Sequence, residues 1–194
     1  MHPFPFYLKL GFEHISNLAG YDHILFLVAL CAVYRIQQWR NILVLVTAFT
    51  IGHSVTLALV SLGAFSISSS TIKFLIPLTI FLTAIHNVIR REETENKPKM
   101  SRNYIMALVF GFIHGMDFSN YFRALLMGDS SITVPLLGFN LGIELGQLLV
   151  VFAIVSVSFL FLNIIKIRHR EWNLFVSGAA AGMSLISMFE NKFW

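Results

Sequence analysis

Long apolar runs separated by short polar segments make up most of this chain. Runs of spanning or nearly spanning length fall at about 15–34, 41–63, 72–90, 102–118, 133–165 and 172–190. About 20 apolar helical residues cross the hydrocarbon core of a bilayer, so the pattern predicts six transmembrane helices. We therefore expect an all-α, polytopic membrane protein in which residues 1–194 form a single transmembrane helical domain.

The composition agrees with a chain that lies in the lipid bilayer. Of the 194 residues, 56% are hydrophobic and 12% are charged, and the mean hydropathy is +0.73, outside the range of soluble domains. The net charge of +4 comes from basic residues in short loops, so it predicts no nucleic-acid partner. The start of the chain lacks the basic region and cleavage site of a secretory signal, and Met1 is expected to belong to the mature protein.

Lysine and arginine are divided unevenly between the two sides of the predicted spans. One side has Arg35, Arg40, Arg90, Arg91, Lys97, Lys99, Arg102, Lys166, Arg168 and Arg170. The other side has Lys9, Lys73, Arg123 and Lys192. Because short loops rich in lysine and arginine stay in the cytoplasm, this distribution predicts that both termini are external. An even number of spans agrees with that topology.

Several ionisable side chains lie inside the predicted spans, where each costs at least a few kcal/mol unless it faces a cavity or a partner. They are Asp22, His23, His53, His86, His114, Asp117 and Glu144, with His14 close by. His23, His53 and His114 lie 12, 13 and 12 residues from a basic residue at the cytoplasmic boundary. At about 1.5 Å per residue, all three reach roughly 18–20 Å into the membrane. Imidazoles from three spans at one level predict a metal or proton site.

Polar side chains form a stripe on the second and on the fifth predicted span, so each span presents one face to protein or water. The first stripe is made of Thr50, His53, Ser54 and Ser61, and the second of Asn140, Glu144 and Gln147. Nearly opposite the second stripe lie Gly138, Gly142 and Gly146, which allow another helix to approach closely. Oxygen atoms of Thr50, Ser54, Asn140 and Gln147 could accept a hydrogen bond from a metal-binding imidazole.

Glu144 does not reach the histidine level on a straight helix. It lies 22 residues from Lys166, about 33 Å from the cytoplasmic side and therefore above the histidines. A strong tilt, or a break near Gly142 or Gly146, would bring it down. The alternative is that Glu144 pairs with a basic side chain such as Arg123.

His14 joins such a site only if the chain bends. His14 and His23 are nine residues apart, which places them on opposite faces of a continuous helix. We expect the bend at Asn17 and Gly20. Asp22, beside His23, has a competing role as the N-cap of the first full helix.

Other residues have structural interpretations that stay open. Asp117 could end the fourth helix on the outside. His86 is four residues from Arg90 and is expected near the cytoplasmic end. It is either a histidine at the membrane interface or a second position on a transport path. Cys31 and Met116 are most simply packing or lipid-facing residues, and a copper(I) site is the less favoured alternative. With one cysteine, the chain has no internal disulfide, and a metal would be held mainly by nitrogen and oxygen.

The segments "GYDHILFLVAL", "FTIGHSVTLAL", "FGFIHGMDF" and "FNLGIELGQ" resemble, in this order, the signature segments of the HupE/UreJ family of small bacterial membrane proteins. The resemblance covers residues 11–147 and implies a nickel or cobalt permease associated with metal supply to hydrogenase or urease. The matching polar positions are Asp22, His23, His53, His114 and Glu144. The chain departs from the family pattern where His14 is followed by Ile15 and where "GMDFS" adds Asp117.

These observations predict a six-helix protein of the bacterial inner membrane that transports a divalent transition metal. The expected metal is nickel, cobalt or zinc, with copper less favoured. The candidate ligands are His23, His53, His114, Asp22, Glu144, His14 and Asp117. The metal ion and the lipid bilayer are the expected partners, and a homo-oligomer or a metal-delivery partner stays open.

Two rival functions would use the same histidines. In a membrane zinc hydrolase, His23, His53 and His114 would hold zinc and an activated water, with Asp22 or Glu144 as base. That enzyme would need an open fourth metal position and a lateral opening for lipid. In a b-type haem protein, pairs of histidines would be axial ligands, and the absorption spectrum of the purified protein would reveal them.

Overall fold

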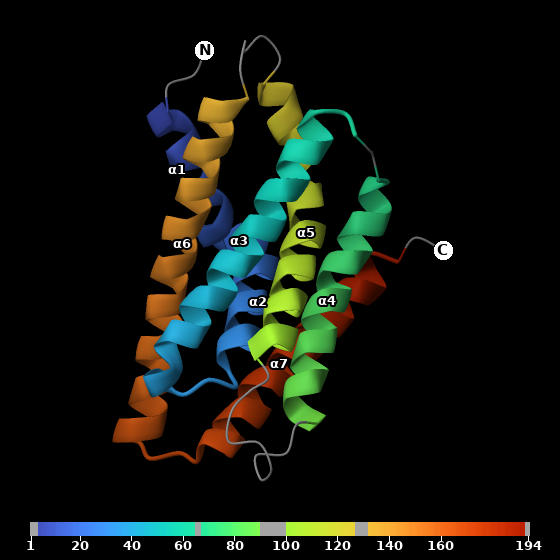
Figure 1. Ribbon diagram of the computed structural model, residues 1–194. Coiled ribbons are helices and arrows are strands. Elements are labelled where there is room, and N and C mark those ends of the chain that lie inside the picture. Colours follow the sequence, from blue (N-terminus) through green and yellow to red (C-terminus); the bar gives the residue numbers. More distant parts are fainter. Residues whose placement is uncertain (1–3, 65–66, 90–99, 127–131, 193–194) are drawn as a thin grey trace.

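The computed structural model of the protein describes residues 4–64, 67–89, 100–126 and 132–192 (Figure 1). Every regular element in these ranges is a helix, which confirms the all-α class for this part of the chain. In chain order the elements are α1 (Phe4–Ser16), η1 (Leu18–Gly20), α2 (Tyr21–Cys31), η2 (Ile36–Gln38), α3 (Trp39–Ser61), α4 (Ser69–Ile89), α5 (Met100–Leu125), α6 (Thr133–Phe159), the π-helical turn η3 (Leu160–Ile164) and α7 (His169–Glu190).

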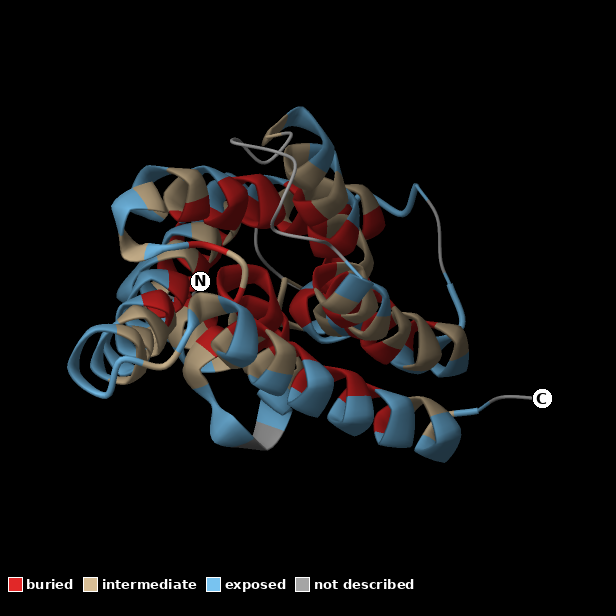
Figure 2. Cartoon of the chain, turned by 90° about the horizontal axis from the view of Figure 1, so that it is seen from below, coloured by how far each residue is buried: buried red, intermediate tan, exposed pale blue. Residues whose placement is uncertain are grey.

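The long helices run side by side and alternate in direction along the chain (Figure 1). α1 and α2 follow one another away from the N-terminal end of the bundle, α3 returns, and α4, α5 and α6 continue the alternation. α7 crosses the bundle obliquely and packs chiefly against α4. Buried residues face the shared interior, and exposed residues face outward (Figure 2).

Four described helical segments are long and apolar enough to cross a membrane. They are Ile36–Ser61, Ser69–Ile89, Thr133–Ile164 and His169–Glu190. Large apolar side chains cover the outside of the bundle: Phe152 is 71% exposed, and Leu137 and Ile186 are each 61% exposed. Because a surface of this kind is costly in water and favourable in lipid, the structure agrees with the membrane protein that the sequence predicts. Six spans and external termini stay predictions.

The first predicted span begins too late and is not continuous. The structure has a helix before it, Phe4–Ser16, which turns through Leu18–Gly20 into Tyr21–Cys31. The predicted bend at Asn17 and Gly20 is therefore correct, whereas the predicted start at residue 15 is wrong. α1 was missed because Lys9 and Glu13 interrupt its apolar run, although both are exposed and form an i,i+4 ion pair on its outer face.

The predicted close approach along the α6 glycines occurs, and the neighbouring helix is α1. A Cβ added at Gly142 would collide with the Leu8 carbonyl, and one at Gly11 would collide with the backbone of α6. Gly138 and Gly146 also face α1, where an added Cβ would lie 3.1 Å and 3.0 Å from a backbone carbonyl oxygen. Small residues on both helices thus hold α1 against α6 at backbone contact distance.

A second glycine contact joins α3 to α5. A Cβ at Gly52 of α3 would collide with the Leu108 carbonyl, and a Cβ at Gly111 of α5 would collide with the Phe49 carbonyl. The two helices therefore approach reciprocally, each through its own glycine. This contact fixes the relative height of α3 and α5, and each of them carries one of the predicted histidines.

Candidate metal centre

The imidazoles of four helices gather inside the bundle: His14 from α1, His23 from α2, His53 from α3 and His114 from α5. The ring centroids of His14 and His23 are 4.7 Å apart, and those of His23 and His114 are 5.2 Å apart. His53 completes the group at 5.7 Å from His14 and 6.2 Å from His23. We call these four residues the histidine cluster.

The tightest triplet in the histidine cluster consists of His14, His23 and His53. Each can offer a ring nitrogen so that the three nitrogens lie within 4.8 Å of one another. Two nitrogens that bind one ion at about 2.0–2.1 Å lie roughly 3.3–4.2 Å apart. Small side-chain adjustments would therefore bring the triplet to bonding distance. The sequence predicted His114 as a main ligand and His14 as an additional one. In the structure, the tightest triplet contains His14 in place of His114.

Five of the eight imidazole nitrogens of the histidine cluster are buried and have no hydrogen-bond partner among the described residues. His53 and His114 are 0% exposed, and His23 is 7% exposed. The ring atoms with no hydrogen-bond partner among the described residues are His14 Nε2, His23 Nε2, His53 Nδ1, His53 Nε2 and His114 Nδ1. Buried polar atoms are nearly always paired, and leaving one unpaired costs about 1–3 kcal/mol. Several unpaired nitrogens in one place indicate a site that binds a ligand.

Phenylalanine rings enclose the histidine cluster. On one side, Phe118 lies 4.3 Å from the His14 ring and stacks on Phe139 at 4.7 Å. On the other side, Phe49 and Phe26 lie 5.2 Å and 5.6 Å from the His114 ring. These rings give the cluster largely apolar surroundings, in which polar interactions are stronger than in water.

Local features of the chain bring the four histidines together. The turn at Leu18–Gly20 redirects the chain, so that His14 and His23 meet although they would face opposite ways on one helix. Gly115, next to His114, packs on the backbone of His53, where an added Cβ would lie 2.7 Å from the His53 carbonyl oxygen. The histidines of α3 and α5 are thus held at the same height by close backbone contact.

Thr79 of α4 contacts the cluster and was not among the predicted residues. Its Oγ1 lies 3.3 Å from His114 Nε2, while the same hydroxyl also donates to the Ile76 carbonyl. This contact holds the ring of His114 in one orientation. Of the predicted acceptors, Thr50 donates to Gln147 Oε1 at 2.6 Å and Ser54 donates to the Thr50 carbonyl, whereas Asn140 Oδ1 has no partner among the described residues.

Two aspartates, Asp22 and Asp117, lie close in sequence to histidines of the cluster. Asp22 is not an N-cap, because α2 is preceded by Gly20, which makes no side-chain cap. Asp22 lies in the first turn of α2, and its buried Oδ1 has no partner among the described residues. Its carboxylate is repelled by the carboxylate of Asp117, and Asp117 is in turn attracted to the ammonium group of Lys73. Asp117 does not end its helix either, since α5 continues to Leu125.

Glu144 and His86 lie away from the histidine cluster. Glu144 accepts a hydrogen bond from Thr47 Oγ1 at 2.7 Å, and Thr47 is about 9 Å along α3 from His53, toward the start of α3. The prediction that Glu144 lies above the histidines is wrong. The helical segment Thr133–Ile164 runs for 32 residues and is longer than the bilayer is thick, so a count of residues from Lys166 overestimates the depth of Glu144. His86 Nε2 lies 3.1 Å from the Arg102 guanidinium.

The fold and this geometry define a helical membrane protein with a buried cluster of imidazoles drawn from four helices. The chain matches the HupE / UreJ protein family model over residues 1–192, and it therefore belongs to that family. Membership implies a membrane protein related to nickel or cobalt transport. Searches of curated proteins and of solved structures find no significant match.

Proposed function

We propose that the protein is a permease that carries a nickel- or cobalt-type divalent ion across the bacterial inner membrane, and that the ion binds to the histidine cluster. The observation that carries the proposal is the convergence of unpaired, buried ring nitrogens from four helices. The metal is the substrate of this protein.

The donor set supports a borderline transition metal. Neutral imidazole nitrogens suit nickel, cobalt and zinc, whereas copper(I) selects thiolate and thioether sulfur. A fourth imidazole also favours transport over hydrolysis, because catalytic zinc sites keep three protein ligands and leave one position for water. His114 Nδ1 would supply that fourth nitrogen, with Thr79 holding its other nitrogen.

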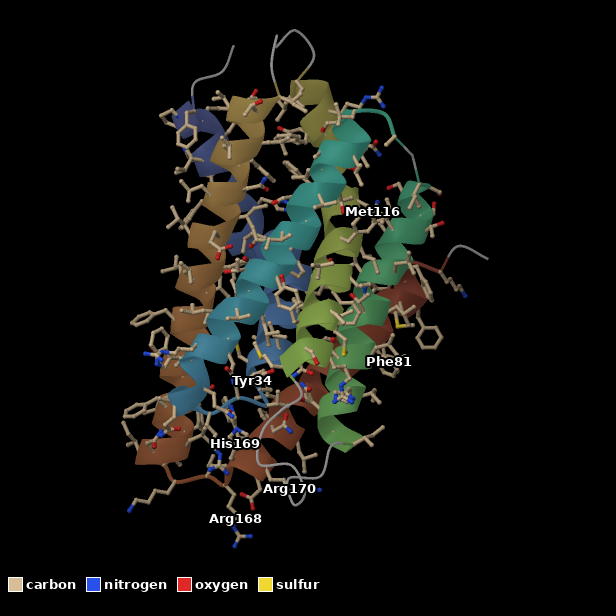
Figure 3. All side chains as sticks on the ribbon, in the orientation of Figure 1. Tyr34, Phe81, Met116, Arg168, His169 and Arg170 are labelled. Atoms are coloured by element: carbon tan, nitrogen blue, oxygen red, sulfur yellow. The ribbon has the colours of Figure 1, made fainter. Side chains whose placement is uncertain are left out.

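The proposed direction of transport, from the external side into the cytoplasm, rests on the charged residues at the two ends of the bundle. In the proposed topology, α1 and α2 together form a broken first span, α3 to α7 form five more, and the end of the bundle that carries Arg168 and Arg170 faces the cytoplasm (Figure 3). Asp22 and Asp117 then lie on the external side of the histidines, where carboxylates attract a divalent cation. Ligands that must be unprotonated link metal binding to proton release.

Uptake by proteoliposomes tests the proposal. His53→Ala and His114→Ala should each lower nickel and cobalt uptake at least tenfold. His169→Ala, at the start of α7 and away from the cluster, is the matched control and should keep wild-type uptake. Unchanged flux of nickel, cobalt and zinc in both cluster variants would exclude the histidines as the transport site.

A further inference from the structure

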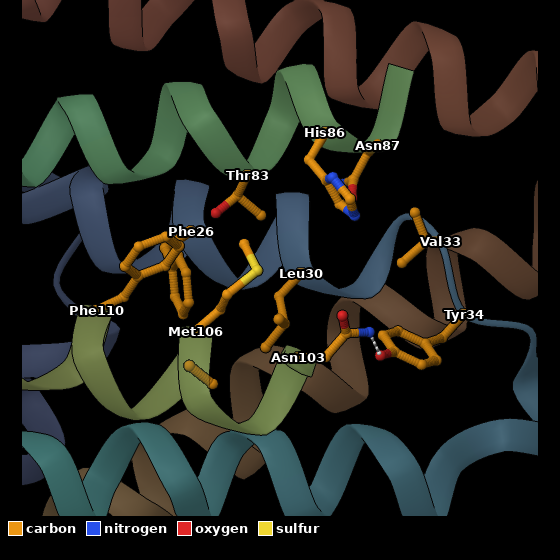
Figure 4. A pocket seen from close by; sticks show the side chains of 11 residues that line it. Phe26, Leu30, Val33, Tyr34, Thr83, His86, Asn87, Asn103, Met106 and Phe110 are labelled. Atoms are coloured by element: carbon orange, nitrogen blue, oxygen red, sulfur yellow. Dashed lines mark hydrogen bonds between the residues drawn. The ribbon is translucent and has the colours of Figure 1, made fainter. Parts of the chain in front are cut away.

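A small cavity lies between α2, α4 and α5 (Figure 4), and its wall is mostly apolar with a few polar side chains. Its volume is about 30 Å³, which is room for about two water molecules. The polar side chains in its lining are Tyr34, Thr83, His86, Asn87 and Asn103. These residues come from α4, from α5 and from the segment after α2.

Hydrogen bonds fix the polar groups around the cavity. Asn103 Nδ2 donates to Tyr34 Oη at 2.6 Å, which ties α5 to the end of the first span (Figure 4). Asn87 Nδ2 donates to the Ala29 carbonyl of α2 at 2.7 Å. The cavity is therefore a defined space with oxygen and nitrogen atoms on its wall, held by contacts between helices.

One face of α4 leads from the histidine cluster to this cavity. Thr79, Thr83 and Asn87 are spaced by four residues, so they lie on the same face, about 6 Å apart along the helix. Thr79 contacts His114, and one turn further Thr83 and then Asn87 line the cavity. Polar atoms thus continue in single-turn steps from the cluster toward the cytoplasmic end.

Phe26 separates the cluster from the cavity. Its ring lies 5.6 Å from the His114 ring on one side and 5.9 Å from Phe110 on the other, and both phenylalanines line the cavity. An ion that leaves the histidines toward the cytoplasm must pass this pair. Passage at this point requires movement of the Phe26 ring, which is 1% exposed.

We infer that this cavity is the inner vestibule of the transport path, which receives the partly dehydrated metal ion from the histidine cluster through a gate formed by Phe26. The inference rests on the proposed function. Binding in the vestibule would be weak, because His86 already contacts the positively charged Arg102. A weak second site suits release, since conduction requires that an ion can leave as well as enter.

Filling the cavity tests the inference. Ala107 is 1% exposed and lines the cavity, so Ala107→Leu should lower nickel flux at least tenfold while the purified protein binds nickel within twofold of wild type. Ile105→Phe adds bulk on the same helix at a position that is 62% exposed, and it should leave flux and binding unchanged. Wild-type flux in Ala107→Leu would overturn the vestibule.

A second variant decides the question if Ala107→Leu does not fold. In a Cys31→Ala background, which lacks other cysteines, Thr83→Cys should react with a charged thiol reagent from the cytoplasmic side, and the reaction should block flux. Leu82→Cys, which is next in sequence and half exposed on the outside of the bundle, should not react. An unreactive Thr83→Cys overturns the vestibule alone, whereas wild-type protein that binds no nickel overturns the proposed function with it.

Discussion

The imidazole rings of His14 and His23 lie 4.7 Å apart although nine residues separate them in the sequence. They meet because α1 ends at Ser16 and α2 begins at Tyr21, with a short 3-10 turn between them. Gly20 has a φ of −101° and a ψ of 58°, outside the helical range. The break therefore contributes directly to the candidate metal centre, since a continuous helix would separate the two rings.

Gly20→Ala should weaken metal binding about tenfold, which corresponds to about 1.4 kcal/mol. Alanine favours helix over glycine by about 1 kcal/mol, and so it opposes the turn that brings His14 to His23. The nickel dissociation constant of the purified protein is the measurement. Gly178→Ala in α7, where an added Cβ meets nothing within 4 Å, is the control. Wild-type affinity in Gly20→Ala would show that the break is not needed.

Thr79→Val should reduce nickel affinity about 10- to 100-fold, the range seen when the group that orients a metal-binding histidine is lost. The substitution keeps the shape of the side chain and removes only the hydroxyl that contacts His114 Nε2. Equilibrium dialysis of the purified variant measures the effect. Ser156→Ala, which removes an exposed hydroxyl bonded only to its own helix backbone, should bind normally.

Glu144→Gln should bind nickel within twofold of wild type, although the family resemblance marks Glu144 as a site residue. Its hydrogen-bond partner is Thr47, about 9 Å along α3 from His53. A glutamine preserves the hydrogen bond from Thr47 and removes the charge. A large loss of affinity in this variant would mean that Glu144 reaches the ion in the metal-bound state.

Metal affinity should fall as the pH is lowered, because a protonated imidazole cannot bind the ion and metal binding is therefore coupled to proton release. Nickel dissociation constants measured from neutral pH down to the lowest pH at which the protein stays folded should show this loss. An affinity that stays constant over the whole series would contradict histidine ligation.

Gly52→Ala should destabilise the fold by about 1–3 kcal/mol, the usual cost of overpacking. The new methyl group would collide with the Leu108 carbonyl and force α3 away from α5. Thermal unfolding in detergent measures the change. Gly182→Ala, where an added Cβ has open space, should be neutral or stabilising because alanine is the better helix former. Equal stability of Gly52→Ala and wild type would rule out the close α3–α5 contact.

Several features of the site could be predicted from the sequence, because they depend on spacing along a single helix. The histidine depth followed from the distance of His23, His53 and His114 to basic residues, and the bend followed from Asn17 and Gly20. Thr79 and Glu144 could not be placed in this way. The position of each depends on which neighbouring helix it faces, and that is a relation between segments far apart in the sequence.

The sequence by itself determined that the chain is helical and apolar enough for a membrane, because hydropathy and helical period are properties of each segment alone. It also identified the glycines of α6 as a packing surface. Only the tertiary structure decided that α1 covers this surface, that His14 completes the tightest triplet, and that α4 supplies the contact to His114. These relations are set by how closely two backbones approach, which depends on the surfaces of both helices at once.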